Sequence, residues 1–206
     1  MNKMDEMVLV VGREHLFNHE ELHFQGYKKT EELPELEDRL MAYEVKRRGD
    51  MEEDESYKQL ITYAVLQDKE TGEYLYYKRL EKSGERRLEG TLSIGVGGHT
   101  NDSENEEITT IDELLYENAE RELNEELLLG EVVKLERVGY VNNDEDAVGR
   151  VHLGVIYCGE VSSKELVRCG EPDVLSLGWA TLDELKQEEN LEDWSSIIVN
   201  STVVND

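Results

Sequence analysis

The segment from Ile111 to Leu127 constrains the fold more than any other part of this chain. Its apolar residues recur at the spacing of helix turns, so on a helix they form one stripe: Leu115, Ala119, Leu123 and Leu127. A stripe of this kind lies against a core, while charged residues take the other faces. The segment therefore predicts an amphipathic helix packed on a globular domain.

Three carboxylates on this predicted helix stand at i, i+3 and i+4, at Glu122, Glu125 and Glu126. That spacing puts them on one face, where like charges repel one another and disfavour full ionisation. A hard divalent cation removes the repulsion, because Mg²⁺ and Mn²⁺ bind carboxylate oxygens together with substrate phosphates. The cluster therefore predicts a metal site. The spacing leaves one alternative open, a solvated acidic helix face.

A glycine-rich stretch precedes the helix. Residues 92–96 have the pattern of a strand, and Gly97 and Gly98 follow directly. Glycines let the backbone approach a metal or a phosphate closely and adopt positive φ, although structural turns explain most glycine pairs. The acidic helix that follows favours the functional interpretation, in which a carbonyl of this pair, assigned here to Gly98, adds a metal ligand.

The composition limits which classes of partner the protein is expected to bind. The 206 residues carry a formal charge of -27, with 49 acidic against 22 basic residues, which argues against general binding to nucleic-acid backbones or anionic membranes. Hydrophobic residues make up 38% and their periodicity recurs along the chain, so the protein is acidic without the composition of a disordered one. The length suits one domain, with room for an appendage.

The cysteines and the amino-terminal residues indicate the cellular compartment in which the protein is expected. Cys158 falls in an apparent buried strand and Cys169 in a later loop, without the paired spacing of a disulfide scaffold or a zinc site. The longest apolar run near the amino end, Met7–Val11, is far too short for a signal core or a membrane span. We expect reduced thiols and a cytoplasmic protein.

Hydrophobic patterning and turn residues predict the remaining elements. Strands are expected at 7–11, 60–66, 74–79, 92–96, 132–141 and 150–157, and helices at 33–48, after the capping pair Thr181 and Glu184, and within 191–199. Residues 60–66 and 74–79 should form a hairpin. The alternation of strands and helices predicts an α/β fold with a mixed sheet between helices.

The predicted acidic helix resembles the signature of a known family. The Nudix signature is G-x5-E-x7-R-E-U-x-E-E-x-G-U, with U a bulky aliphatic residue, and its central part fits Glu113, seven residues, and then Arg121 to Glu126. The resemblance spans about residues 60–199. It implies a catalytic domain at 59–206 and an N-terminal extension of a strand and a helix at 1–58. That extension together with the sequence of residues 93–100 is similar to a branch of predicted Nudix phosphoesterases.

Two positions depart from the signature. Fourteen residues rather than five separate Gly98 from Glu113, so residues 100–107 resemble a polar surface insertion. Leu128 stands where the signature has its second glycine, and the nearest glycine is Gly130. We therefore expect the helix to run about a turn longer before Gly130 ends it.

The resemblance implies a metal-dependent enzyme, a pyrophosphohydrolase that cleaves a diphosphate linkage in a nucleoside-diphosphate-like compound with Mg²⁺ or Mn²⁺ as cofactor. Homodimers are common in the family, so the resemblance also implies a possible homodimer. The implied catalytic residues are Glu125, Glu126, Arg121 and Glu113, with Arg121 and Glu113 in positioning roles, and Glu145 in the loop 142–146 as a general base. An ordinary polar turn is the alternative for that loop.

Basic residues cluster before the motif, at Lys78, Arg79, Arg86 and Arg87. They serve either as counter-charges in an acidic chain or as phosphate ligands, for which a bidentate guanidinium is well suited. We predict substrate binding by Arg79 and Arg86, and by His99 after the glycine pair.

Two other functions remain open. A non-catalytic nucleotide-binding sensor could share the fold, because the loop insertion and Leu128 could abolish chemistry and retain binding. An isomerase of isoprenoid diphosphates also has a Nudix fold, but it normally uses an active-site cysteine. Cys158 and Cys169 come well after the motif, which disfavours that activity.

Overall fold

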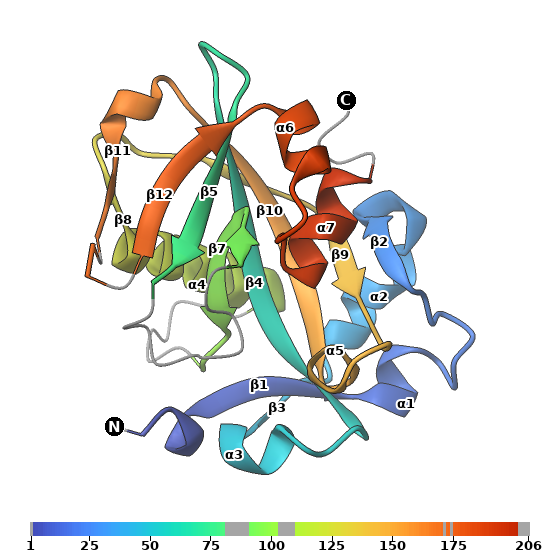
Figure 1. Ribbon diagram of the computed structural model, residues 1–206. Coiled ribbons are helices and arrows are strands. Elements are labelled where there is room, and N and C mark those ends of the chain that lie inside the picture. Colours follow the sequence, from blue (N-terminus) through green and yellow to red (C-terminus); the bar gives the residue numbers. More distant parts are fainter. Residues whose placement is uncertain (1, 81–90, 103–109, 171, 174, 202–206) are drawn as a thin grey trace. The chain divides into compact units, whose positions relative to one another are not determined.

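The protein has an α/β fold, as its patterning predicts (Figure 1). The structure is a computed structural model that describes residues 2–80, 91–102, 110–170, 172–173 and 175–201. Within these residues ten strands belong to one mixed sheet, whose main path has the order β12-β5-β4-β10-β9-β2. Strands β8 and β11 form a separate antiparallel pair.

The elements have the following bounds. The strands are β1 (Met7–Gly12), β2 (Gly26–Lys29), β3 (Glu44–Arg47), β4 (Tyr57–Asp68), β5 (Tyr74–Arg79), β6 (Leu92–Ser93), β7 (Gly95–His99), β8 (Leu127–Leu129), β9 (Leu135–Asn142), β10 (His152–Val161), β11 (Val167–Cys169) and β12 (Leu175–Ala180). The α-helices are α1 (Arg13–Leu16), α2 (Pro34–Leu40), α3 (Arg48–Met51), α4 (Ile111–Glu126), α5 (Ala147–Arg150), α6 (Leu182–Gln187) and α7 (Asp193–Val199), and short 3-10 helices occupy Lys3–Asp5, Thr30–Glu32 and Lys164–Leu166.

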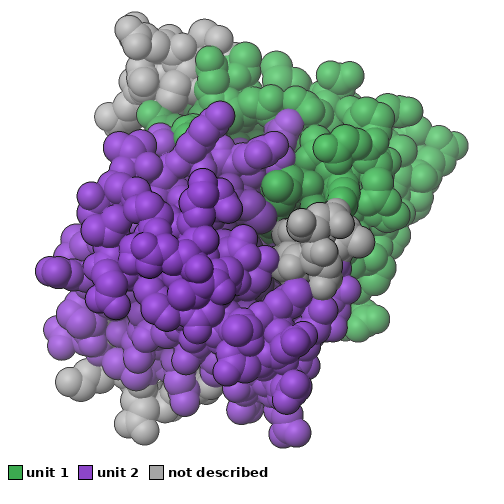
Figure 2. All heavy atoms as spheres, turned by 90° about the horizontal axis from the view of Figure 1, so that it is seen from above, with its two compact units in different colours: residues 1–62, 98–119, 138–156 green, residues 63–97, 120–137, 157–206 purple. Residues whose placement is uncertain are grey.

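The chain divides into two compact units, coloured green and purple in Figure 2. Unit 1 comprises residues 1–62, 98–119 and 138–156. In it β1 pairs with β3 and with β4, and β2 pairs with β9, all antiparallel. Residues 1–58, predicted as an extension, all fall in this unit, and the boundary at residues 58 and 59 stays a prediction.

One predicted helix in unit 1 is wrong in its second half. Helix α2 ends at Leu40, and residues 44–47 form strand β3 instead of continuing the helix to residue 48. The apolar spacing over 33–43 is helical, but the backbone groups of Val45 and its neighbours pair with β1, in the register Leu9 to Val45. Long-range pairing here overrides a local pattern that is compatible with a helix.

Unit 2 comprises residues 63–97, 120–137 and 157–206. Strand β5 pairs with β12 along its whole length and with β4 at the predicted hairpin, where Gln67 lies opposite Tyr74. The predicted capping box at the start of α6 is present: the Thr181 hydroxyl accepts from the Glu184 amide, and the Glu184 carboxylate accepts from the Thr181 amide.

Gly95 makes room for a buried tyrosine. It lies in β7, which runs on through Gly97 and Gly98 to His99 instead of ending at residue 96 as predicted. A Cβ atom at Gly95 would lie 1.8 Å from Cε1 of Tyr63, so only glycine fits beside that ring. The Tyr63 hydroxyl lies 2.7 Å from Ser195 Oγ of α7 and donates to the carboxylate of Glu192. Burial, and after it the charge of Glu192, raises the pKa of Tyr63 well above its usual value. This network fixes β4, which carries Tyr63, to the start of α7.

The helices also bear on membrane association. Over the described residues, no helix has both the length and the apolar character that crossing a bilayer requires.

Candidate functional site

Helix α4 carries the acidic cluster, and the four residues of the predicted apolar stripe are buried, although the last of them, Leu127, is the first residue of β8 rather than part of the helix. Relative exposures along the stripe are 0% for Leu115, 1% for Ala119, 2% for Leu123 and 1% for Leu127. Burial of these residues fixes how the helix is rotated about its axis. The side chains at 122, 125 and 126 therefore take defined positions rather than those of a freely rotating surface helix.

The three carboxylates differ in exposure. The Glu122 side chain is 15% exposed and that of Glu125 is 60% exposed. Glu126 is half-buried and its Oε2 atom is buried. Glu122 and Glu126 are thus partly shielded from solvent, whereas Glu125 is mostly exposed. This difference argues against a uniformly solvated acidic face.

Arg121 contacts two of these carboxylates, and the positioning role expected for it stays a prediction. Its Nη1 donates to Glu125 Oε1 at 3.0 Å, and its Nη2 donates to Glu122 Oε1. Burial would lower the pKa of Arg121, but the charges and hydrogen bonds of Glu122 and Glu125 raise it above its usual value. The guanidinium holds the side chains together and partly offsets their repulsion.

The carboxyl end of α4 differs from the prediction. The helix ends at Glu126, not a turn later, and β8 begins at Leu127. The amide of Gly170 donates to the carbonyl of Glu126 at 2.8 Å, and a Cβ atom at Gly170 would lie 2.9 Å from the carbonyl oxygen of Glu125. The glycine that closes this helix end therefore comes from a distant segment. Its side-by-side position follows from the pairing of β8 with β11.

Leu128 occupies the position of the missing signature glycine. It lies in β8, opposite Arg168, and is 59% exposed. The backbone at this position is extended, so a leucine is accommodated without left-handed geometry.

Tyr77 of β5 is a functional candidate that the sequence alone did not reveal. Its side chain is buried, and burial raises its pKa, with a further increase from the charge of Glu126 and a decrease from Arg79. Arg79 Nη2 donates to the Tyr77 hydroxyl at 3.3 Å, and its guanidinium lies 5.4 Å from the ring centroid. One buried hydroxyl thus lies within electrostatic range of both Glu126 and Arg79.

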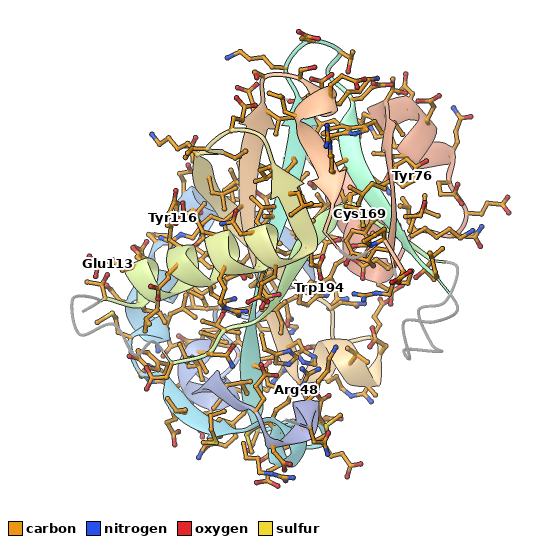
Figure 3. All side chains as sticks on the ribbon, turned by 90° about the vertical axis from the view of Figure 1, so that its left-hand side faces the viewer. Arg48, Tyr76, Glu113, Tyr116, Cys169 and Trp194 are labelled. Atoms are coloured by element: carbon orange, nitrogen blue, oxygen red, sulfur yellow. The ribbon has the colours of Figure 1, made fainter. Side chains whose placement is uncertain are left out.

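Glu113 begins the motif helix. Its carboxylate accepts from the amide and the hydroxyl of Thr110 at 3.1 and 3.0 Å, and its own amide donates to the Thr110 hydroxyl at 3.3 Å. Figure 3 shows Glu113 at one end of α4. This reciprocal pattern is a capping box, so Glu113 stabilises the start of the helix. A positioning role of Glu113 in catalysis stays a prediction.

Glu145, the predicted general base, is an exposed residue of the turn before α5. Its neighbour Asp144 contacts three basic side chains of unit 1. Asp144 accepts from Lys58 Nζ at 2.6 Å and from Arg13 Nη2 at 2.8 Å, and it lies 2.8 Å from His23 Nε2. Burial would raise the pKa of Asp144, but the hydrogen bonds of Arg13 and Lys58 hold it well below its usual range. Asp144 anchors the loop, and a general-base role for Glu145 stays a prediction.

The other predicted contacts are placed as follows. Gly98 and His99 are half-buried residues at the end of β7, and His99 Nε2 lies 3.1 Å from His152 Nε2. The Gly98 carbonyl stays a predicted ligand. Arg86, predicted to bind substrate, and Arg87 lie outside the described residues, as does most of the predicted loop insertion.

Cys158 lies in a hollow of unit 2 with a volume of about 540 Å³. The hollow is also lined by Val65, Tyr74 and Glu136, and none of the predicted site residues that the structure describes contributes to it. Burial, and after it the charge of Glu136, raises the pKa of the Cys158 thiol to about 12. A thiol of this kind is a poor nucleophile, which disfavours the cysteine-dependent isomerase.

The carboxylate cluster fits a hard divalent ion. Its donors are carboxylate oxygens from one turn of helix, a set that suits Mg²⁺ or Mn²⁺ better than the softer ions that prefer thiolate and imidazole. The buried Oε2 of Glu126 and the low exposure of Glu122 place two donors where a carboxylate gains from charge compensation.

Comparisons with known proteins extend these observations. No family model matches the chain. Protein YmaB of Bacillus subtilis (strain 168) is 39% identical over 207 residues, covering 97% of this chain and 98% of that protein.

Two solved structures are similar to the chain. Tm1382, a candidate Nudix hydrolase, has a TM-score of 0.74 at 28% identity and covers 96% of this chain and 98% of its own. The NUDIX domain of Shewanella oneidensis NrtR, complexed with ADP ribose, has a TM-score of 0.51 at 21% identity and covers 68% of this chain and 84% of its own. The second likeness concerns the fold alone.

Proposed function

Because the chain belongs to the Nudix superfamily, we propose that it is a metal-dependent hydrolase that cleaves a diphosphate linkage in a nucleoside-diphosphate-like compound. The observation that carries the proposal is the set of three carboxylates on one turn of α4, two of them largely withdrawn from solvent. The proposed cofactor is Mg²⁺ or Mn²⁺, held by Glu122, Glu125 and Glu126.

Hydrolysis of a diphosphate requires compensation of charge. The phosphate oxygens repel an attacking water, and a bound divalent ion neutralises them and acidifies that water. The carboxylates of α4 hold such an ion, and Arg121 keeps two of them in place. The guanidinium of Arg79 binds a substrate phosphate in this proposal. It is placed near the cluster, because Arg79 donates a hydrogen bond to the Tyr77 hydroxyl and the charge of Glu126 raises the pKa of the same hydroxyl.

Arg79→Ala tests the phosphate contact. Loss of a charge-assisted hydrogen bond costs about 1.5–3 kcal/mol, so KM should rise roughly 10- to 100-fold. Lys78→Ala is the matched control, because the neighbouring residue of a strand points to the opposite face and Lys78 is exposed. Steady-state kinetics with the substrate found below measure both variants. An unchanged KM for Arg79→Ala would remove this contact from the proposal.

Metal should stabilise the folded protein by mass action, because the unfolded chain lacks the assembled cluster. At about 100 times its Kd, the ion adds about 2.7 kcal/mol to the free energy of unfolding, which corresponds to a rise in Tm of about 5–10 °C. Thermal melts with and without Mg²⁺ or Mn²⁺ measure this shift, and Glu125→Gln should reduce it. Equal Tm values in all solutions would argue for a metal-free acidic face.

A substrate screen tests the activity itself. Purified protein with Mg²⁺ or Mn²⁺ is incubated with nucleoside triphosphates, nucleotide sugars, dinucleoside polyphosphates and dinucleotide cofactors, together with ADP ribose, the compound bound by the NrtR domain. We expect phosphate-containing products from the wild type and far less from Glu126→Gln. Metal-dependent binding without products would instead identify a nucleotide sensor.

The proposed partner is a small phosphorylated molecule, in keeping with the formal charge of -27, which opposes general binding to nucleic acid. We further propose that the protein acts in the cytoplasm, where its two cysteines stay reduced, and that it forms a homodimer.

A further inference from the structure

Glu52, His99 and His152 come together in unit 1. Glu52 follows the last residue of α3, His99 ends β7 and His152 begins β10. One potential ligand atom from each lies within 4.8 Å of the other two. His152 is 5% exposed and the other two are half-buried. These residues converge from three distant segments, unlike the neighbouring carboxylates of one helix.

The two imidazoles have a geometry that suits a shared cation. Their Nε2 atoms are 3.1 Å apart and the rings are inclined at 76°. A tetrahedral ion with bonds of about 2.0–2.1 Å holds its ligand atoms about 3.3 Å apart. The same distance also permits a hydrogen bond between the two rings, so the experiment below must separate these arrangements.

The tautomer of His152 is determined by its other ring nitrogen. Nδ1 lies 2.7 Å from the Val148 carbonyl, which only accepts, so Nδ1 carries the proton. In the neutral ring Nε2 then presents its lone pair toward His99. Burial lowers the pKa of both histidines, and the proximity of His152 lowers that of His99 further. Neutral imidazole is the form that binds metal.

Outer contacts also orient the carboxylate. Arg48 Nε donates to Glu52 Oε1 at 2.9 Å, which holds the carboxylate in place. Arg48 Nη1 donates to Glu6 at 3.2 Å, so a second carboxylate compensates the charge of the guanidinium. Figure 3 labels Arg48. Hydrogen bonds from the ligands to groups behind them are characteristic of protein metal sites.

We propose that Glu52, His99 and His152 form a second metal site, which takes a borderline divalent ion of the Zn²⁺ type. Two imidazoles and one carboxylate form a donor set that suits Zn²⁺ and is softer than the all-oxygen cluster of α4. His99 is then a metal ligand rather than the predicted substrate contact. A bound ion would cross-link α3, β7 and β10 within unit 1. The proposal stands apart from the hydrolase activity, because it concerns other residues and another class of ion.

Zinc binding by the full chain tests this site. Protein stripped with a chelator is titrated with Zn²⁺ by calorimetry in excess Mg²⁺, which occupies hard oxygen sites. We expect one equivalent to bind, with affinity reduced at least about 10- to 100-fold in His99→Gln and in Glu52→Gln, since even the loss of an outer-shell partner has that effect. Absorption of bound Co²⁺ in place of Zn²⁺ reports the coordination.

Two controls distinguish this site from others. His15→Gln removes an exposed histidine elsewhere in unit 1 and should bind Zn²⁺ like the wild type. Glu126→Gln should do the same, whatever its effect on hydrolysis. Circular dichroism of each variant verifies folding. Absence of Zn²⁺ uptake by the wild type, equal affinity in folded His99→Gln, or loss of uptake in Glu126→Gln would each overturn the proposal.

Discussion

Glu126→Gln is expected to lower kcat by roughly 10²- to 10³-fold, the effect of removing one group that stabilises charge in a transition state. Glutamine keeps the size and the hydrogen-bonding shape of the side chain but removes its charge. The change is made where Oε2 is buried and where three carboxylates share one helix turn. Initial rates under saturating substrate, with Mg²⁺ and with Mn²⁺, measure the effect.

Glu126→Gln should lower activity without lowering the stability of the metal-free protein. Because the three carboxylates repel one another without metal, removing one charge should leave the metal-free Tm unchanged or raise it. The rise in Tm on adding Mg²⁺ should become smaller, because one ligand is gone. Glu120→Gln on the same helix is the control for a loss of charge outside the cluster. Wild-type kcat in Glu126→Gln would refute the assignment of the site.

Asp144→Asn is expected to lower the free energy of unfolding by about 3 kcal/mol. Removing one partner of a buried ion pair costs about 3–5 kcal/mol, because the other charge remains buried. Lys58 is 0% exposed, whereas Asp144 is 19% exposed, so the lower end of that range applies. Burial already lowers the pKa of Lys58 to about 8, with Asp144 as the group that opposes this shift. Urea unfolding near pH 7 measures the difference.

The pH dependence of this effect has a definite sign. The pKa of Asp144 is depressed in the folded state, so its contribution is present above the ordinary carboxyl pKa of about 3.9. It is lost as the pH falls through the folded value. Wild type and Asp144→Asn should therefore converge in stability in strong acid. Combining Lys58→Met with Asp144→Asn should recover most of the loss, because no unpaired charge stays buried. A difference below about 0.5 kcal/mol near pH 7 would contradict the anchoring role.

Much of the fold follows from hydrophobic spacing. The burial of Leu115, Ala119 and Leu123 on α4 follows directly from their helical period, and the hairpin of β4 and β5 from alternation and turn residues. The strand at residues 44–47 could not be predicted from hydrophobic spacing, because its conformation depends on pairing with β1. Local pattern identifies an element where burial and propensity agree. It fails where a distant partner decides between two acceptable conformations.

The site divides in the same way. The three carboxylates and Arg121 are neighbours in sequence, so their proximity could be predicted from helical spacing alone. Tyr77 and Gly170 could not be predicted, because only the folded backbone brings β5 and the end of β11 to the cluster. His152 is a similar case. It lies 53 residues from His99, a separation that resembles no metal-binding motif.

The contact between Gly170 and Glu126 has a consequence for biosynthesis. A ribosome releases the motif helix well before it reaches Gly170, so the nascent chain holds all three carboxylates while the last carbonyls of the helix are still open to water. The helix terminus acquires its final geometry only after β11 has emerged and paired with β8. Capture of the proposed cation by the cluster should thus wait until the residues up to Gly170 have left the ribosome.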